Sequence, residues 1–246
     1  MEKPDRTTSP DSFPASCRSA GRVLVCSIPK AGTYLLAAIL KELGLEDTRL
    51  HISREEASIH HQGSLEQHRT LPEKYRFKLP VQDTVPQIGP NQYAVSHLPF
   101  DLDTEVLCRN LRALYIKRDL RDCVVSFMRF VIDTGRDNCT SSDWIKAPEG
   151  SERLARFLEE YRWYFDLWVA PTLGWQMAPN VITVAFESLM GDFGRSDQLQ
   201  TLSLICRHIG LQPDQIDMGS VIDAALNTST MTWSGRRECD LQKVRR

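Results

Sequence analysis

The sequence predicts an α/β fold with a central, mostly parallel sheet flanked by helices on both faces. Short runs rich in aliphatic and β-branched residues indicate buried strands at residues 22–28, 112–118 and 180–186, and a run at 92–97 indicates another that ends in a turn. Stretches with helical periodicity lie between these strands. Strands that alternate with helices pair in parallel and are covered on both faces.

The first strand stops at Pro29, and "TYLLAAILKELGL" then carries leucines and alanines on a helical period, with Gly44 near the C-cap. Residues 51–90 are rich in histidine and proline, which predicts an irregular connection over the surface. Further helices are expected in four places: 120–133, about 151–169, roughly 196–209 and 214–226.

Composition limits the class of protein. The 246 residues, 41% of them hydrophobic, are enough to form one domain, which we expect at 21–246. Residues 1–20 carry charges, prolines and serines and are expected to form a flexible arm. A formal charge of −2 provides no basic field for nucleic acid. The apolar runs are too short to span a membrane, and the N-terminus has charges and prolines where a signal peptide needs an apolar core. We therefore expect a soluble, cytoplasmic protein.

The seven cysteines are odd in number, widely spaced and without a C-x-x-C pair. This pattern predicts reduced thiols and gives neither a disulfide framework nor a zinc site.

Polar residues follow four of the predicted strands. Ligands of a parallel sheet bind beyond the carboxyl ends of its strands. This rule places Lys30, His97, Arg118 and Glu187 along one edge.

The stretch "SIPKAGTY" (27–34) resembles a phosphate loop whose lysine precedes the glycine, unlike G-x-x-x-x-G-K-[ST]. Gly32 lets the backbone approach a ligand, and the N–H groups of Thr33 and Tyr34 begin a helix whose positive end attracts an anion. Lys30 adds a charge and Thr33 a hydroxyl. Taken alone, the motif fits an ordinary strand-to-helix turn equally well.

A second basic motif, "KRDLRDCVVSF", places Arg118 after a strand and Ser126 in the following helix. A guanidinium and a hydroxyl are suited to a second phosphate. The alternative is a solvated cluster of charges that caps the helix.

Together these motifs are similar to those of the sulfotransferases that use 3′-phosphoadenosine 5′-phosphosulfate (PAPS). "SIPKAGTYLL" resembles their 5′-phosphosulfate loop, and "KRDLRDCVVSF" resembles their 3′-phosphate motif. Between the two, "VSHLPFDL" is similar to the segment with the catalytic histidine of the family. Later, "VITVAFESLMGD" and "TSTMTWSGRREC" resemble a strand-turn segment and the C-terminal segment that closes on the 3′-phosphate. The likeness runs from about Val23 to Arg237 and implies the P-loop-like sulfotransferase fold.

The resemblance implies roles for individual residues. His97 becomes the general base for the acceptor hydroxyl, and Lys30 neutralises charge on the bridging oxygen. The residues implied to bind PAPS, or the product 3′-phosphoadenosine 5′-phosphate (PAP), are Lys30, Ala31, Gly32, Thr33, Tyr34, Arg118, Ser126, Phe186, Arg236 and Arg237. No metal is implied. His51, His60, His61 and His68 are interpreted as structural.

The sequence departs from the family pattern at several positions. Tyr34-Leu35 stands where the family often has Thr-Trp, and Leu120, Val95 and Phe186 replace a proline, a lysine and a tyrosine. The C-terminal tryptophan segment of relatives is not found in "SGRRECDLQKVRR".

We therefore expect sulfuryl transfer to a hydroxyl of a small molecule, with an amine as the less favoured acceptor. A secondary metabolite such as an alkaloid, an antibiotic or a polyketide fits the short bacterial tailoring type, and a homodimer is compatible with it. Two alternatives stay open at this point: an ATP-dependent small-molecule kinase, and a degenerate nucleotide-binding protein without catalytic activity.

Overall fold

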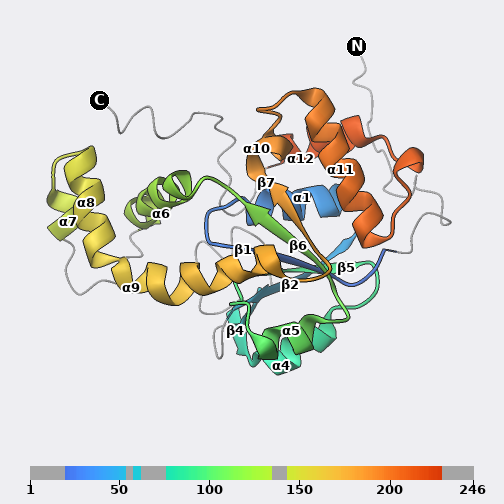
Figure 1. The fold of residues 1–246 in the computed structure, drawn as a ribbon, viewed down its shortest axis with the longest axis horizontal. Helices are drawn as coiled ribbons and strands as arrows, with labels where there is room; N and C mark the ends of the chain where they lie inside the picture. The colour runs from blue at the N-terminus through green and yellow to red at the C-terminus, as the bar shows by residue number, and fades with distance from the viewer. Residues whose placement is uncertain (1–19, 54–57, 62–75, 135–142, 229–246) are drawn as a thin grey trace, which may run out of the picture.

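A computed structural model describes residues 20–53, 58–61, 76–134 and 143–228 (Figure 1). These residues form a seven-stranded sheet in the order β4-β3-β2-β5-β1-β6-β7. The strands are β1 (Val23–Ser27), β2 (Glu46–Ile52), β3 (Ser58–His61), β4 (Arg76–Leu79), β5 (Gln92–Ser96), β6 (Arg112–Lys117) and β7 (Val181–Ala185). Strands β2, β5, β1, β6 and β7 pair in parallel, whereas β3 and β4 add to the β2 edge in antiparallel pairing. The predicted α/β fold is confirmed.

Alternate residues of β1 point into two separate cores. Val23 and Val25 pack in one core, and Leu24 and Cys26 pack in the other, all of them fully buried. A strand that is buried on both faces has a continuous apolar sequence, which "VLVCS" shows.

Helices on one face of the sheet are α1 (Thr33–Glu42), α10 (Phe186–Met190), α11 (Arg195–Ile209) and α12 (Met218–Asn227). The other face is covered by α4 (Val81–Thr84), the 3₁₀ turn η3 (Val85–Gln87), α5 (Leu102–Cys108) and the 3₁₀ segment η5 (Ala170–Met177). Figure 1 shows these two layers above and below the strands. A further 3₁₀ turn, η6 (Pro213–Gln215), precedes α12.

An aromatic lobe extends to one side of the sheet (Figure 1). It consists of α6 (Leu120–Thr134), α7 (Asp143–Lys146), α8 (Ser151–Glu160), α9 (Arg162–Tyr164) and the π-helical turn η4 (Phe165–Val169). Its core includes Trp144, Phe157 and Tyr161, each with 1% or less of its surface exposed. Phe127 stacks on Tyr164 with their ring centroids 4.4 Å apart.

Two predicted features need correction. The described parts of residues 51–90 are not an irregular connection, because β3, β4, α4, η3 and the end of β2 lie there. The sequences of β2, β3 and β4 lack the continuous apolar run by which buried parallel strands are found. The helix expected at 151–169 begins at Ser151 but is interrupted at Tyr161 and continues as α9 and η4.

Residues 1–19 of the expected arm lie outside the described residues, whereas Ala20 is buried. Within the described ranges no helix is both long and apolar enough to cross a membrane. The cysteines that the structure describes, namely Cys26, Cys108, Cys123 and Cys206, are free and buried.

Candidate active site at the carboxyl edge of the sheet

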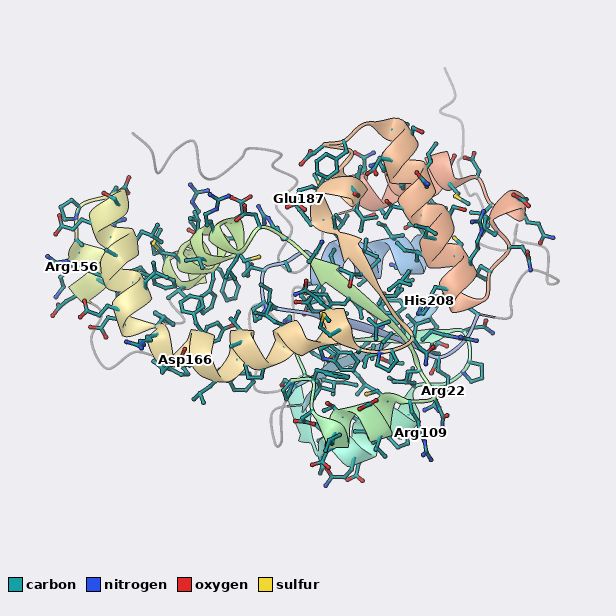
Figure 2. All side chains as sticks on the ribbon, in the orientation of Figure 1. Arg22, Arg109, Arg156, Asp166, Glu187 and His208 are labelled. Carbon is teal, nitrogen blue, oxygen red and sulfur yellow. The ribbon has the colours of Figure 1, made fainter. Side chains whose placement is uncertain are left out.

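The predicted edge residues follow four adjacent strands. His97 follows β5, the loop with Lys30 follows β1, Arg118 follows β6, and Glu187 lies one residue beyond Phe186 after β7. Figure 2 shows Glu187 at the carboxyl end of the sheet and Arg22, which precedes β1, at the opposite end. Parallel pairing therefore brings these residues to one edge, as the sequence predicts.

The loop after β1 is shaped for close approach of an anion. Gly32 has φ of 106° and is the N-cap of α1, and its N-cap position makes no side-chain capping hydrogen bond. The first N–H groups of a helix lack acceptors within the helix, so they can bind an anion together with the helix dipole. A Cβ at Gly32 would lie 2.4 Å from Cδ2 of Phe186. The loop thus tolerates only glycine at this position.

Lys30 lies in this loop, two residues before Gly32, and has a left-handed backbone conformation with φ of 69°. Its Nζ is 4.4 Å from the centroid of the Phe130 ring, a cation–π contact with α6. Burial and the nearby charge of Arg118 lower its pKa to about 8, against opposing effects of Asp133 and Cys123. The site holds two neighbouring cations that repel each other, so a bound anion would relieve the repulsion.

Arg118 carries an unsatisfied buried donor. Its guanidinium lies over the Phe186 ring at 4.6 Å, and its Nε has no hydrogen-bond partner in the described part of the chain. The Nη2 atom is 3.9 Å from Oδ2 of Asp122, whose buried Oδ1 is also unpartnered. Burial raises the pKa of Asp122, against the lowering effect of Arg118. Buried donors are nearly always paired in proteins, so Arg118 fits a group that binds an external anion.

Arg121 fits the alternative interpretation of this motif, a solvated cluster of charges that caps the helix. It donates from Nε and Nη2 to the carboxylate of Asp119 and leaves 70% of its side chain exposed. Arg121 and Asp119 are therefore the solvated charge cluster at the start of α6, whereas Arg118 is not. Glu187 accepts from the N–H of Asp119 at 3.3 Å and joins the turns after β6 and β7.

His97 is held in one tautomer. Its Nδ1 lies 2.7 Å from the carbonyl oxygen of Ser27, and a carbonyl can only accept, so Nδ1 carries the proton and Nε2 the lone pair. Burial lowers the pKa of His97 to about 4; the hydrogen bond to Ser27 opposes this shift and the charge of Lys30 adds to it. His97 is therefore a neutral imidazole near pH 7, with Nε2 able to accept a proton.

Two residues that the sequence did not single out lie next to these groups. The hydroxyl of Ser27 is 2.5 Å from that of Thr33 and 3.4 Å from Nδ1 of His97, so it connects the loop to His97. His51, interpreted above as structural, lies with its ring centroid 4.8 Å from that of His97. Ser27 could have been found as the first residue of the phosphate-loop motif. No motif marks His51, which reaches the site because β2 pairs with β5.

The other predicted site residues are placed as follows. Ala31 is fully buried against Cys123 and Val169, and Phe186 is buried with 8% exposed. Ser126 is partly buried on α6. Arg236 and Arg237 lie outside the described residues.

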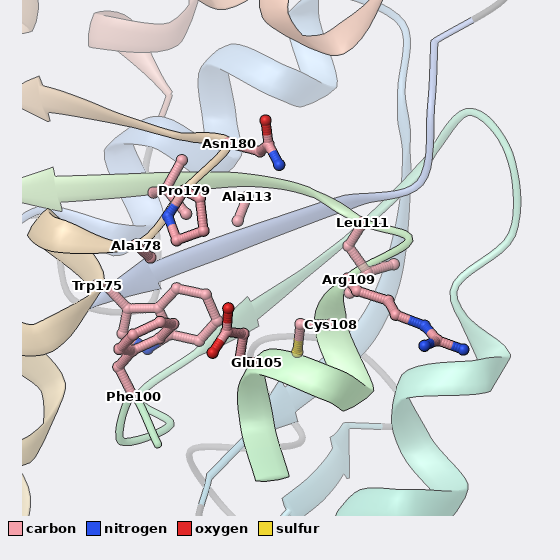
Figure 3. A pocket seen from close by; sticks show the side chains of 11 residues that line it. Phe100, Glu105, Cys108, Arg109, Leu111, Ala113, Trp175, Ala178, Pro179 and Asn180 are labelled. Carbon is pink, nitrogen blue, oxygen red and sulfur yellow. The ribbon is translucent and has the colours of Figure 1, made fainter. Parts of the chain in front are cut away.

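A small pocket of about 90 Å³ lies at the opposite edge (Figure 3). It is lined by residues at the amino ends of β6 and β7 and by α5 and η5, among them Phe100, Cys108, Trp175 and Val181. None of the predicted site residues lines it. Among the described residues no group of three or more histidines, cysteines or carboxylates is arranged to hold a metal.

Comparison with known proteins identifies a family. The chain matches the sulfotransferase domain over residues 20–219. Among solved structures it is similar to mouse sulfotransferase SULT7A1 complexed with PAP, with 15% identity, a TM-score of 0.50, and coverage of 90% of this chain and 74% of that one. Retinol dehydratase in complex with androsterone and inactive cofactor PAP gives 14% identity, a TM-score of 0.49, and coverage of 82% and 63%. No curated protein matches the sequence. At 15% identity, the likeness to the mouse structure supports the fold alone.

The contact between Gly32 and Phe186 generates a stability prediction. Gly32→Ala adds a methyl against the ring and forces alanine into a positive φ of 106°, whereas Gly44→Ala also has a positive φ, 88°, but with nothing within 4 Å of the new Cβ. We expect Gly44→Ala to lower the free energy of unfolding by about 1 kcal/mol and Gly32→Ala by roughly 1–3 kcal/mol more. Urea-induced unfolding measures both. Equal losses for the two variants would show that the ring contact is not tight.

Proposed function

This chain belongs to the sulfotransferase domain family, and we propose that it transfers the sulfuryl group of PAPS to a hydroxyl of a small-molecule acceptor with His97 as the general base. The observation that carries the proposal is the neutral imidazole of His97 beside a cationic phosphate-type loop. A neutral base next to a site for a polyanion is the arrangement that removes a proton from an acceptor while the leaving group is stabilised.

The described residues fit PAPS at both of its charged ends. The N-terminus of α1, Lys30 and the Thr33 hydroxyl would hold the 5′-phosphosulfate. The unsatisfied Nε of Arg118, with Ser126 on α6, would hold the 3′-phosphate. Phe186 lies beneath both Gly32 and Arg118, so its ring supports the two anion sites from below.

In the transfer, the acceptor oxygen forms a bond to sulfur while the bond from sulfur to the bridging oxygen breaks. The acceptor proton moves to Nε2 of His97, and the electron pair of the broken bond stays on the bridging oxygen. Lys30, when protonated, stabilises that developing negative charge. The charge of Lys30 lowers the pKa of His97, so the two groups lie near each other, and we assign His97 to the acceptor and Lys30 to the leaving group of the same sulfuryl group.

The acceptor class is a further part of the proposal. Aromatic side chains of the lobe, including Phe130 and Tyr164, surround the loop that carries Lys30. Together with the resemblance to tailoring enzymes, this supports a hydroxylated, largely apolar secondary metabolite as the acceptor. A screen of hydroxylated metabolites with labelled PAPS identifies the acceptor. The family membership sets the ATP-dependent kinase aside.

Binding of PAP tests the assignment of the 3′-phosphate. We expect PAP to bind without Mg²⁺ and more tightly than AMP, which lacks the 3′-phosphate. Arg118→Ala should lower the affinity for PAP by about tenfold or more, because a charged hydrogen bond is lost, and should leave AMP binding nearly unchanged. Titration calorimetry measures both ligands.

Arg121→Ala is the matched control for Arg118→Ala, because it removes an exposed arginine from the same motif. It should change neither affinity. If Arg118→Ala weakens PAP and AMP equally, Arg118 does not bind the 3′-phosphate.

Removal of His97 tests the base. His97→Ala should lower kcat by a factor on the order of 10²–10⁴ while PAP binding stays close to normal. In the natural enzyme kcat/KM should stay constant as the pH is lowered and should fall only near pH 4. The reason is that the pKa of His97 is lowered to about 4, so that the base becomes protonated below that value. His208→Ala removes a partly buried histidine on α11 and should keep full activity. An acid limb near the ordinary histidine pKa of about 6.5 would argue against His97 in this environment.

The lowered pKa of Lys30 predicts that the protein takes up a proton when PAP binds. Its pKa is lowered to about 8 in the free protein, and a bound anion should raise it again. At about pH 8.5 part of the Lys30 population in the free protein is neutral, and these molecules take up a proton when PAP binds. Calorimetry detects this uptake, because the measured heat of binding then depends on the ionisation enthalpy of the buffer. Lys30→Arg stays charged at every accessible pH and should bind PAP without uptake. The same uptake in this variant would assign the proton to another group.

A further inference from the structure

We propose that His51 and Tyr34 act as a positioning pair for His97, so that the helix that binds the phosphosulfate also orients the base. This inference rests on the proposed role of His97. It concerns two residues that no part of the mechanism above uses through their side chains.

Three elements bring the three side chains together. The Tyr34 hydroxyl, on the first turn of α1, is 3.0 Å from Nδ1 of His51 on β2. The His51 ring meets the His97 ring at an interplanar angle of 63°, with centroids 4.8 Å apart. Backbone pairing fixes this geometry, because Ile52, which follows His51, accepts a hydrogen bond from the N–H of His97 at 2.9 Å.

His97 needs a second contact to hold its ring. The hydrogen bond from Nδ1 to Ser27 anchors one edge of the ring, whereas the opposite edge, which carries Nε2, is held by its other contacts. An edge-to-face contact between rings has a preferred geometry and restricts rotation of the ring. The ring of His51 supplies it, and Nε2 of His97 is thereby kept in one direction.

Tyr34 holds His51 in turn. The hydrogen bond between its hydroxyl and Nδ1 of His51 fixes the imidazole whichever atom donates. The backbone N–H of Tyr34 belongs to the first turn of α1, where the anion is expected. A single residue therefore links the phosphosulfate site to the orientation of the base. A threonine, which the family often has at this position, is too short to reach in the same way.

Nitrogen NMR of histidine side chains tests the pair without any turnover. In the natural protein, with and without PAP, His97 should show one tautomer with its proton on Nδ1. In Tyr34→Phe and in His51→Phe, which keep the ring but lose the hydrogen bond, the His97 signals should shift and show exchange between orientations. His208→Phe, a like substitution on α11, should leave them unchanged. Unchanged His97 signals in both test variants overturn the proposal.

Kinetics with the acceptor found in the screen provide the second readout. Tyr34→Phe and His51→Phe should each lower kcat on the order of 10- to 100-fold, as expected for a misdirected base, while PAP affinity stays near that of the natural enzyme. The double variant should be no worse than either single one, because the two residues act as a unit. A loss of PAP affinity with kcat preserved, or additive losses, overturns the proposal.

Different results would contradict the role of His97 as the base and the role of Tyr34 and His51 as its positioning pair. If His97→Ala keeps normal turnover while the His97 signals still shift and show exchange in Tyr34→Phe, the base assignment is wrong and the positioning pair stands. If His97→Ala is inactive while the two variants behave like the natural enzyme, the pair is wrong and the base stands. Should His51→Phe disturb β2 itself, Tyr34→Phe, which lies outside the sheet, decides alone.

Discussion

Parallel pairing of β1 with both β5 and β6 is the constraint on which the site depends. It places the ends of three strands side by side, so that Ser27, His97 and Arg118 lie at one edge although up to 91 positions of sequence separate them. Backbone hydrogen bonds, and not side-chain chemistry, set this arrangement. The fully buried β1 makes it rigid, because each face of the strand is packed in its own core. Functional groups on rigid strand ends need little reordering when a ligand binds.

Two cations close to each other are the second feature of this edge. Lys30 and Arg118 are both partly buried, and each rests on an aromatic ring, Phe130 and Phe186 respectively. Such contacts stabilise a cation only modestly, and the buried Nε of Arg118 is still unsatisfied. The repulsion between the two cations and the unpaired donor lower the stability of the folded protein, and an anionic ligand would remove both costs. The same surroundings keep His97 neutral, since burial and the charge of Lys30 both oppose its protonation.

Most of the fold could be predicted from the sequence because its central strands are continuous apolar runs with helices between them. Strands β2, β3 and β4, on one side of the sheet, could not be predicted in this way, since "EDTRLHI", "SIHH" and "RFKL" carry polar residues and lack the continuous apolar run of the central strands. The contact between His51 and His97 could not be predicted for the same reason. A histidine in a segment interpreted as an irregular connection has no partner in the sequence, whereas on β2 it lies beside His97. Helix α8 ended early because the aromatic residues of the lobe pack on α6 and on one another, which periodicity within one helix does not reveal.

The sequence by itself determined the order and spacing of the motifs, and with them the α/β class, the family and the candidate groups Lys30, His97 and Arg118. These are local properties: a strand, a glycine and a charged side chain at set distances along the chain. Only the tertiary structure decided which nitrogen of His97 is free, that Arg118 and not Arg121 has a buried donor without a partner, and that the Tyr34 hydroxyl meets His51 beside the His97 ring. Each of these depends on which atoms meet across different strands, and on how far water is excluded there, and neither property is written in the spacing of residues along one chain.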